Sequence, residues 1–438
     1  RCYYFGHIST IVSTVNSSDM LTDTQSDTSA TEINYPFIVA IGGSAGGQEA
    51  VVQLLGQLTD TTGFAFVYIQ HLSPDHDSYL VDILARATTM PVTEAVHLTP
   101  VQPNHVYILP PGQEMELRDG KLLLTPRSRP IYMPIDRFFI SLSEQQQAGA
   151  VAILLSGMDT DGTLGLKAIR VAGGITMAQD STARFQTMPN SAITESVVDL
   201  VLPPKAMADE VIRLSKQTDT LKLTGGPSEE TESQLLTDKA EQEPVIADPD
   251  NADDLRPIIQ LIQKTIGVDF SQYKVTTIRR RIIRRMVLYK LDNLAGYTRY
   301  LREHPAEARM LHNDLLINVT SFFRDPAAMS YMGQVVLPQL IRSKQPGEPL
   351  RIWVPACSTG QEAYSLAILL METLGDNVPT PLIHIFATDL SEPAIAKARQ
   401  GIYTKSEVID VSGRRLQRFF TRTDDRYRIQ KSIRDLCI

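Results

Sequence analysis

The chain has 438 residues, of which 43% are hydrophobic and 21% are charged, and its formal net charge is −8 at pH 7. This length is typical of two to three globular domains. The acidic balance argues against a general nucleic-acid-binding protein, whose surface is usually basic, so we expect no nucleic-acid partner.

The cysteine count and the hydropathy pattern narrow the class of protein further. The three cysteines, Cys2, Cys357 and Cys437, are odd in number and widely spaced, which predicts neither a disulfide framework nor a metal site. No apolar run approaches the roughly 20 residues that span a bilayer, so we expect no membrane insertion. We predict a cytoplasmic protein whose first 34 residues, rich in Ser and Thr, are disordered.

Three predicted strands are each followed by a polar loop. The strands cover residues 37–41, 65–69 and 151–155, and the loops after them supply Ser44, His71 and Asp161. In a parallel α/β sheet the carboxyl ends of the strands open on one edge. The three side chains can therefore meet there as a nucleophile, its base and the group that orients the base, which predicts a serine hydrolase.

Each of these residues also has a plainer interpretation. The glycine-rich loop around Ser44 is also typical of phosphate-binding turns, and a histidine after a strand is often structural. An aspartate before a glycine, such as Asp161, commonly starts a turn or caps a helix. The order Ser, His, Asp differs from that of α/β-hydrolases, although Gly42-x-Ser44-x-Gly46 has the form of their nucleophile turn. The joint placement of the three residues favours catalysis.

Five segments of the first half carry a family resemblance, namely residues 41–47, 69–72, 156–162, 178–180 and 188–193. Together they resemble the catalytic domain of the chemotaxis receptor methylesterase CheB. The resemblance implies that Ser44 is the nucleophile, His71 the base and Asp161, rather than Asp159, the third member of the triad. It also implies that the Met158 backbone N–H donates to the oxyanion, and that this half needs no cofactor.

The middle of the chain begins with an acidic, poorly apolar run at 217–253, which reads as a linker. Apolar residues then recur at helical spacing from Leu255 to Ile266. The next predicted helix, 273–288, carries Arg279, Arg280, Arg281, Arg284 and Arg285. We weigh two interpretations for it, a solvated helix face and a docking face for a negatively charged partner.

A second α/β pattern follows. A predicted strand at 350–354 leads through a loop of small residues into a helix at 361–371, and a second strand at 382–387 ends at Thr388-Asp389. A small-residue loop after one strand and an acid after the next is the nucleoside-binding arrangement of Rossmann-like sheets, in which the carboxylate binds the ribose hydroxyls. The pattern alone does not choose between NAD and another nucleoside.

The choice between NAD and another nucleoside cofactor rests on five segments, residues 273–286, 318–324, 352–365, 387–390 and 401–403. They resemble the chemotaxis receptor methyltransferase CheR, which uses S-adenosylmethionine. The resemblance implies that Asn318, Thr320 and Arg324 line the methionine end of this cofactor. It further implies that Glu362 contacts the cofactor's amino group and that Asp389 contacts the ribose. Because the family's domain continues well past the point that corresponds to Ile438, we expect this methyltransferase domain to be truncated and to bind the cofactor weakly or not at all.

The predicted fold is α/β: a doubly wound parallel-sheet esterase domain, a small helical domain and a partial Rossmann-like methyltransferase domain. The expected divisions are a disordered segment at 1–34, the esterase at 35–216, the linker at 217–253, the helical domain at 254–315 and the methyltransferase domain at 316–438.

The two resemblances predict a fusion of a protein-glutamate methylesterase and a protein-glutamate O-methyltransferase. The implied partners are the cytoplasmic helices of chemoreceptors, whose glutamates carry or lack methyl esters. Two alternatives stay open: a signalling scaffold with an active esterase and an inactive, truncated methyltransferase, and a serine esterase that acts on small molecules.

Overall fold

The computed structural model describes residues 35–71, 79–127, 132–217, 254–316, 319–345, 348–375, 383–423 and 426–438. The predicted disordered segment at 1–34, nearly all of the predicted linker and Asn318 lie outside these residues.

Seven strands form one sheet, in the order β10-β9-β8-β1-β2-β5-β3. In that order they are Leu200–Leu202, Ile175–Gln179, Val151–Leu154, Ile38–Gly43, Ala65–Gln70, Val106–Ile108 and Val92–Glu94. Every neighbouring pair is parallel. The strand β1 lies between β8 and β2, so the loops that carry Ser44, His71 and Asp161 all leave neighbouring strands at the same edge.

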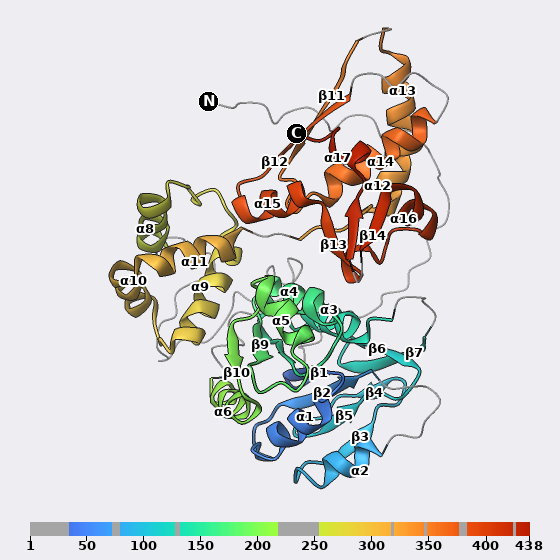
Figure 1. Ribbon diagram of the computed structural model, residues 1–438. Helices are drawn as coiled ribbons and strands as arrows, with labels where there is room; N and C mark the ends of the chain where they lie inside the picture. The colour runs from blue at the N-terminus through green and yellow to red at the C-terminus, as the bar shows by residue number, and fades with distance from the viewer. Residues whose placement is uncertain are drawn as a thin grey trace, which may run out of the picture. The chain divides into compact units, whose positions relative to one another are not determined.

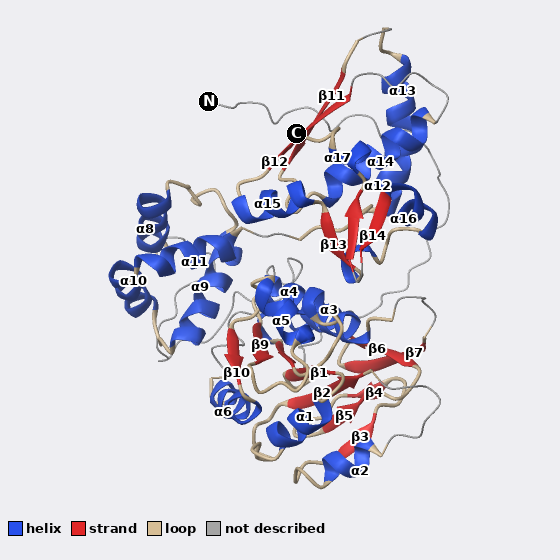
Figure 2. Ribbon diagram, viewed as in Figure 1, coloured by secondary structure: helices blue, strands red, loops and turns tan. Residues whose placement is uncertain are grey.

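Helices cover both faces of this sheet (Figures 1 and 2). Helices α1 (Gly47–Leu55), α2 (Leu80–Ala85) and α6 (Pro204–Ser215) pack with one set of strand residues, which includes Val39 and Ile41. Helices α3 (Pro134–Gln146), α4 (Thr163–Ala172) and α5 (Thr187–Thr194) pack with the alternate set, which includes Ile38 and Ala40. Because side chains alternate along each strand, every second residue packs into the core on one face of the sheet and the others pack into the core on the opposite face. The predicted doubly wound α/β fold is confirmed.

Beside α3 lies a small antiparallel sheet that the sequence pattern does not predict. Its strands are β4 (Thr99–Pro100), β7 (Lys121–Pro126) and β6 (Gln113–Arg118), in that order. Met115, Leu117 and Leu122 insert into the core on the α3 side of the main sheet. The apolar residues in β6 and β7 are too few for their alternation to stand out in the sequence.

Four helices make up the next region: α8 (Arg256–Ile266), α9 (Val275–Tyr289), α10 (Leu294–Glu303) and α11 (Pro305–Leu315). Their apolar faces share one core, in which Ile258, Ile282, Tyr297 and Leu311 are buried. The Asn293 side chain caps α10 by accepting a hydrogen bond from the Gly296 N–H at 2.8 Å.

Four of the five arginines of α9 are buried, which contradicts both interpretations of this helix. Arg284 pairs with Asp199 and Asp314, and Arg285 pairs with Glu307 and Asp314. The buried arginines of α9 are Arg279, Arg281, Arg284 and Arg285. A buried guanidinium needs carboxylate or carbonyl partners, and this chain supplies them from distant parts of its own sequence, so spacing within α9 cannot reveal the burial.

The last region contains a two-stranded parallel sheet of β11 (Leu350–Pro355) and β12 (Ile383–Thr388). Around it lie α12 (Pro326–Tyr331), a π-helical turn (Met332–Val336), α13 (Leu337–Arg342), α14 (Gln361–Leu374) and α15 (Glu392–Gln400). An antiparallel sheet follows, with strands β13 (Ile402–Thr404), β15 (Arg426–Ile429) and β14 (Phe420–Thr423) in that order. The short helices α16 (Gly413–Phe419) and α17 (Lys431–Arg434) complete the region.

Candidate active sites

The loop around Ser44 is held in place by Ser156, which follows β8. The Ser44 N–H donates to the Ser156 carbonyl at 2.9 Å, and the Ser156 hydroxyl donates to the Ala45 carbonyl at 2.8 Å. The same hydroxyl accepts a hydrogen bond from the Phe185 N–H at 2.9 Å. The sequence predicts no role for Ser156, and the structure shows that this residue is fully buried just after β8.

Gly46 is required where the Ser44 loop turns into α1. Its φ is 74°, a left-handed conformation that favours glycine. A Cβ at this position would lie 2.8 Å from the Ser156 hydroxyl oxygen. The close approach of the two loops therefore depends on the missing side chain.

His71 and Asp161 meet at this edge of the sheet. The His71 Nε2 lies 2.7 Å from the Asp161 Oδ2, and the Asp161 side chain is wholly buried. The Asp161 carboxylate also accepts hydrogen bonds from the N–H groups of Ile135, Asp136 and Gly162, at 3.0, 2.8 and 2.9 Å. Two of these donors belong to the first turn of α3, where the helix dipole stabilises a negative charge.

Opposing influences set the pKa of His71. Burial of the ring is the largest of them and favours the neutral form. The hydrogen bond and charge of Asp161, together with the charge of Asp159, act in the opposite direction. Their combined effect raises the pKa of His71 above its ordinary value.

The strand register brings the backbones that lead into Ser44 and His71 next to each other. Gly43 is opposite Gln70 in the β1–β2 pair, so the next residues, Ser44 and His71, leave adjacent strands, which are about 4.8 Å apart in such a sheet. No hydrogen bond joins Ser44 to His71 within the described part of the chain. Because Asp161 occupies Nε2, the Nδ1 atom of His71 is the one left to accept a proton.

Two further groups complete the site. Met158 is exposed, and its backbone N–H has no hydrogen-bond partner among the described residues. Asp136 is buried behind Asp161 and accepts a hydrogen bond from the Gly165 N–H at 2.7 Å. Burial and the negative charge of Asp161 raise the pKa of Asp136 well above its ordinary value. The sequence does not predict that Asp136 supports the site, because nothing in its local sequence signals burial.

The second site lies at the carboxyl ends of β11 and β12. Pro355 is opposite Thr388 in this parallel pair, so the loops that follow the two strands lie next to each other. The Asp389 carboxylate accepts hydrogen bonds from the N–H groups of Ser358 and Ser391, both at 2.8 Å. Glu362 lies in the first turn of α14, directly after the β11 loop, and is exposed.

The β11 loop turns tightly before α14 begins. Ala356, Ser358 and Gly360 all have positive φ, at 54°, 49° and 93°. A Cβ on Gly360 would lie 2.9 Å from the Cβ of Ala398 in α15. A carboxylate has about four lone-pair positions, so Asp389 keeps acceptor capacity beyond its two backbone donors. These residues therefore fit the ribose and amino groups of an adenosyl cofactor.

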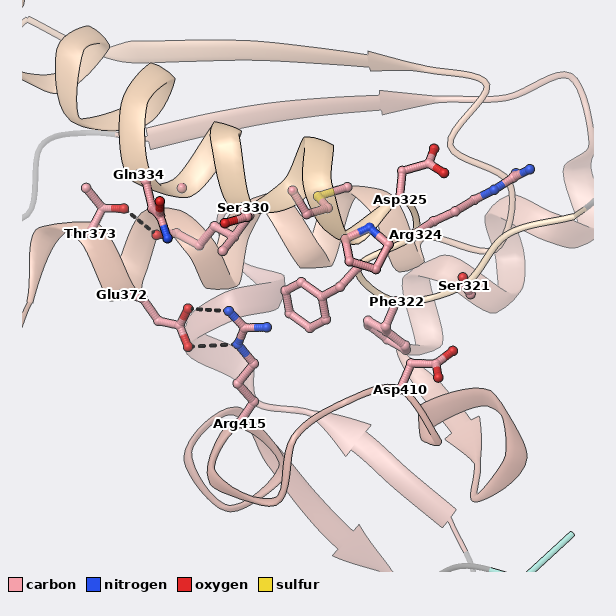
Figure 3. A pocket seen from close by; sticks show the side chains of 15 residues that line it. Ser321, Phe322, Arg324, Asp325, Ser330, Gln334, Glu372, Thr373, Asp410 and Arg415 are labelled. Atoms are coloured by element: carbon pink, nitrogen blue, oxygen red, sulfur yellow. Dashed lines mark hydrogen bonds and ion pairs between the residues drawn. The ribbon is translucent and has the colours of Figure 1, made fainter. Parts of the chain in front are cut away.

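Arg324 lines a separate pocket of about 750 Å³, next to α12 and α14. Inside this pocket Arg415 forms two hydrogen bonds to Glu372, at 3.0 and 2.9 Å, and stacks over the Phe323 ring at 4.0 Å. Figure 3 shows the Arg324 side chain pointing away from the Arg415–Glu372 pair. Among the described residues, the lining of this pocket includes neither Glu362 nor Asp389.

Models of known protein families match the region of the seven-stranded sheet, the four-helix region and the last region of the chain. The family "CheB methylesterase" matches residues 39–211, "CheR methyltransferase, all-alpha domain" matches 253–316, and "CheR methyltransferase, SAM binding domain" matches 318–438. The chain joins a CheB methylesterase domain to the two domains of a CheR methyltransferase.

Individual proteins match parts of this chain. An uncharacterized 104.1 kDa protein of Rhodobacter capsulatus is 33% identical over 368 residues, which cover 82% of this chain and 38% of that protein. Chemotaxis protein methyltransferase 2 of Pseudomonas aeruginosa is 32% identical over 170 residues, or 39% of this chain and 59% of the relative. The chain thus spans less than two thirds of either relative.

One solved structure matches part of the chain. The Thermotoga maritima CheB methylesterase catalytic domain matches with a TM-score of 0.39 and 29% identity, over 41% of this chain and 98% of that structure.

Metal clusters and membrane spans are both absent from the described residues of the CheB and CheR domains. These residues contain no group of three His, Cys, Asp or Glu side chains placed to hold a metal ion. None of their helices combines the length and the apolar character that a membrane span requires.

Proposed function

We propose that the CheB domain hydrolyses methyl esters of glutamate side chains, and that the CheR domains transfer methyl groups to such glutamates. The 2.7 Å contact between His71 and Asp161, at the sheet edge that also carries Ser44, is the observation that best supports the esterase. The matched CheB family supplies the reaction class.

In the proposed esterase reaction, Ser44 attacks the ester carbonyl while the Nδ1 atom of His71 takes its proton. Asp161 holds the imidazole through Nε2 and stabilises the imidazolium that forms. The Met158 N–H, which has no other partner among the described residues, donates to the developing oxyanion. Methanol leaves with the proton from His71, and water then releases the glutamate from Ser44.

For the transferase we propose that S-adenosylmethionine binds at the carboxyl ends of β11 and β12. When bound, this cofactor supplies an electrophilic methyl group to the glutamate oxygen. Asp389 would bind the ribose and Glu362 the amino group, while Arg324, Thr320 and Asn318 would face the methionine carboxylate. The exposed Arg324 guanidinium donates only to the Val319 carbonyl at 3.1 Å among the described residues, which leaves donors for that carboxylate. The work of these residues is mainly positioning.

We further propose that the substrates are glutamates on the cytoplasmic helices of chemoreceptors, and that the protein acts in the cytoplasm. Methyl esterification removes a negative charge from a helix surface, and hydrolysis restores it. Like charges three or four residues apart destabilise a helix. The two activities would therefore adjust the packing of a signalling coiled coil in opposite directions.

Methanol release from a glutamate methyl ester tests the esterase assignment. The substrate is a helical peptide that carries one γ-methyl ester, and the comparison is with Ser44→Ala. We expect the parent protein to release methanol and Ser44→Ala to lose several orders of magnitude in rate, about 10⁶-fold in a well-studied serine protease. Equal rates for both proteins would contradict the assignment. Hydrolysis of short neutral esters but not of the peptide would favour a small-molecule esterase.

A further inference from the structure

Two exposed arginines of the CheB domain lack an ion pair and lie next to the triad. Arg127 and Arg184 have no carboxylate within ion-pair distance among the described residues. Other arginines of this domain form ion pairs with carboxylates, namely Arg118, Arg137, Arg170 and Arg213. An unpaired guanidinium in a protein of net charge −8 is available for a negatively charged partner.

Arg127 lies on the His71 side of the site. Its guanidinium stacks 4.5 Å from the centre of the Tyr132 ring, and that ring is 6.0 Å from the His71 ring. The Tyr132 hydroxyl donates to the Gln113 carbonyl at 2.7 Å, which fixes the ring on which Arg127 rests. The charge of Arg127 is also close enough to oppose protonation of His71.

Arg184 lies on the Ser44 side. A Cβ built on Gly46 would be 3.1 Å from the Arg184 Cβ, so this arginine borders the nucleophile loop. Its guanidinium is 5.7 Å from the centre of the Phe185 ring. The Phe185 backbone bonds to the Ser156 hydroxyl and to the N–H of Gly157, the residue before Met158. These bonds tie the backbone next to Arg184 to the loop that carries the proposed oxyanion donor.

We propose that Arg127 and Arg184 form a recognition pair that binds free carboxylates on either side of the ester in an acidic helical substrate. This inference rests on the proposed esterase activity. A methyl ester is neutral, so the reacting residue offers no charge to recognise, whereas neighbouring unmethylated glutamates do. Guanidinium groups bind carboxylates with charge-assisted hydrogen bonds. Asp159, which is close enough to act on His71, disfavours carboxylates at the centre of the site and leaves the two flanks for them.

Selectivity between two peptides tests the recognition pair. Both helical peptides carry one glutamate methyl ester, flanked by free glutamates in the first and by glutamines in the second. The proteins are the full chain, Arg127→Gln, Arg184→Gln and the control Arg86→Gln, which removes an exposed arginine at the end of α2. Methanol release is measured at a pH on the plateau of the esterase profile.

We expect each of Arg127→Gln and Arg184→Gln to lower the kcat/KM ratio of acidic to neutral peptide by a factor of about two to five, the effect of one exposed ion pair. Added salt should lower the parent's ratio in the same direction, and Arg86→Gln should leave it unchanged. If the parent protein had equal kcat/KM for the two peptides, the recognition pair would be overturned but the esterase assignment would stand. No methanol from either peptide would overturn the esterase assignment and the recognition pair together.

Discussion

Asp161 and Asp159 lie two residues apart but meet His71 in different ways. Asp161 bonds to Nε2 from a buried position, whereas the Asp159 side chain accepts a hydrogen bond from the Thr160 N–H. We predict that Asp161→Asn lowers methanol release about 10⁴-fold, the loss seen when the corresponding change in a serine protease fixes the wrong tautomer. Asp159→Asn should keep most of the activity. The reverse order of the two effects in the same assay would show that the wrong aspartate has been assigned.

The pH dependence of the esterase follows from the raised pKa of His71. As a base, His71 must be neutral, so kcat/KM should rise with pH through a pKa above 6.5. Asp159 contributes to this elevation, so Asp159→Asn should lower the pKa of His71 and move the rising limb to lower pH. The measurement is the pH profile of methanol release from the neutral peptide. A limb that moves to higher pH would contradict the electrostatic account of this site.

At the level of the nucleophile loop, glycine geometry gives a matched pair of variants. Gly46 and Gly63 have nearly the same φ, 74° and 73°, but an added Cβ would meet other atoms within 4 Å only at Gly46. We predict that both Gly→Ala changes cost about 1 kcal/mol of backbone strain, and that only Gly46→Ala also displaces the loops and removes most esterase activity. Loss of methanol release in both variants, or in neither, would contradict this packing argument.

The strands and their loops can be predicted well from the sequence because each strand is a short apolar run that ends in recognisable turn residues. Ser44 and His71 follow such runs directly. Ser156 and Asp136 support the site through long-range contacts, Ser156 with Ala45 and Phe185, and Asp136 behind Asp161. Such contacts join residues far apart in the chain, so local patterns do not signal them.

Helix α9 shows that local charge patterns likewise do not reveal long-range contacts. Five arginines in one helix are typical of a solvated or docking surface, yet Arg284 and Arg285 pair with Asp199, Glu307 and Asp314. The partner Asp199 is 85 residues away in sequence from Arg284. Charge composition predicts that these arginines need acidic partners, but only the fold decides that the partners come from the same chain.

Across the whole molecule, the two sites share no residue, so their activities should separate by mutation. Asp389→Asn removes one carboxylate oxygen at the proposed ribose contact and keeps one acceptor for the backbone. We predict that it weakens S-adenosylmethionine binding about tenfold or more, since a hydrogen bond to a charged group is worth about 1.5–3 kcal/mol. Methanol release should stay at the parent level. Calorimetry measures the affinity for S-adenosylmethionine, and the methanol assay on the same preparations measures the esterase rate. A loss of esterase activity in Asp389→Asn would contradict separate sites.

The most direct test of the central claim is covalent labelling of the proposed nucleophile. A fluorophosphonate reacts with activated serines, and peptide mass spectrometry locates the modified residue. We predict one modified residue, Ser44, with labelling lost in Ser44→Ala and in His71→Ala. Modification at another serine, or none under conditions in which the protein releases methanol, would contradict the proposed triad.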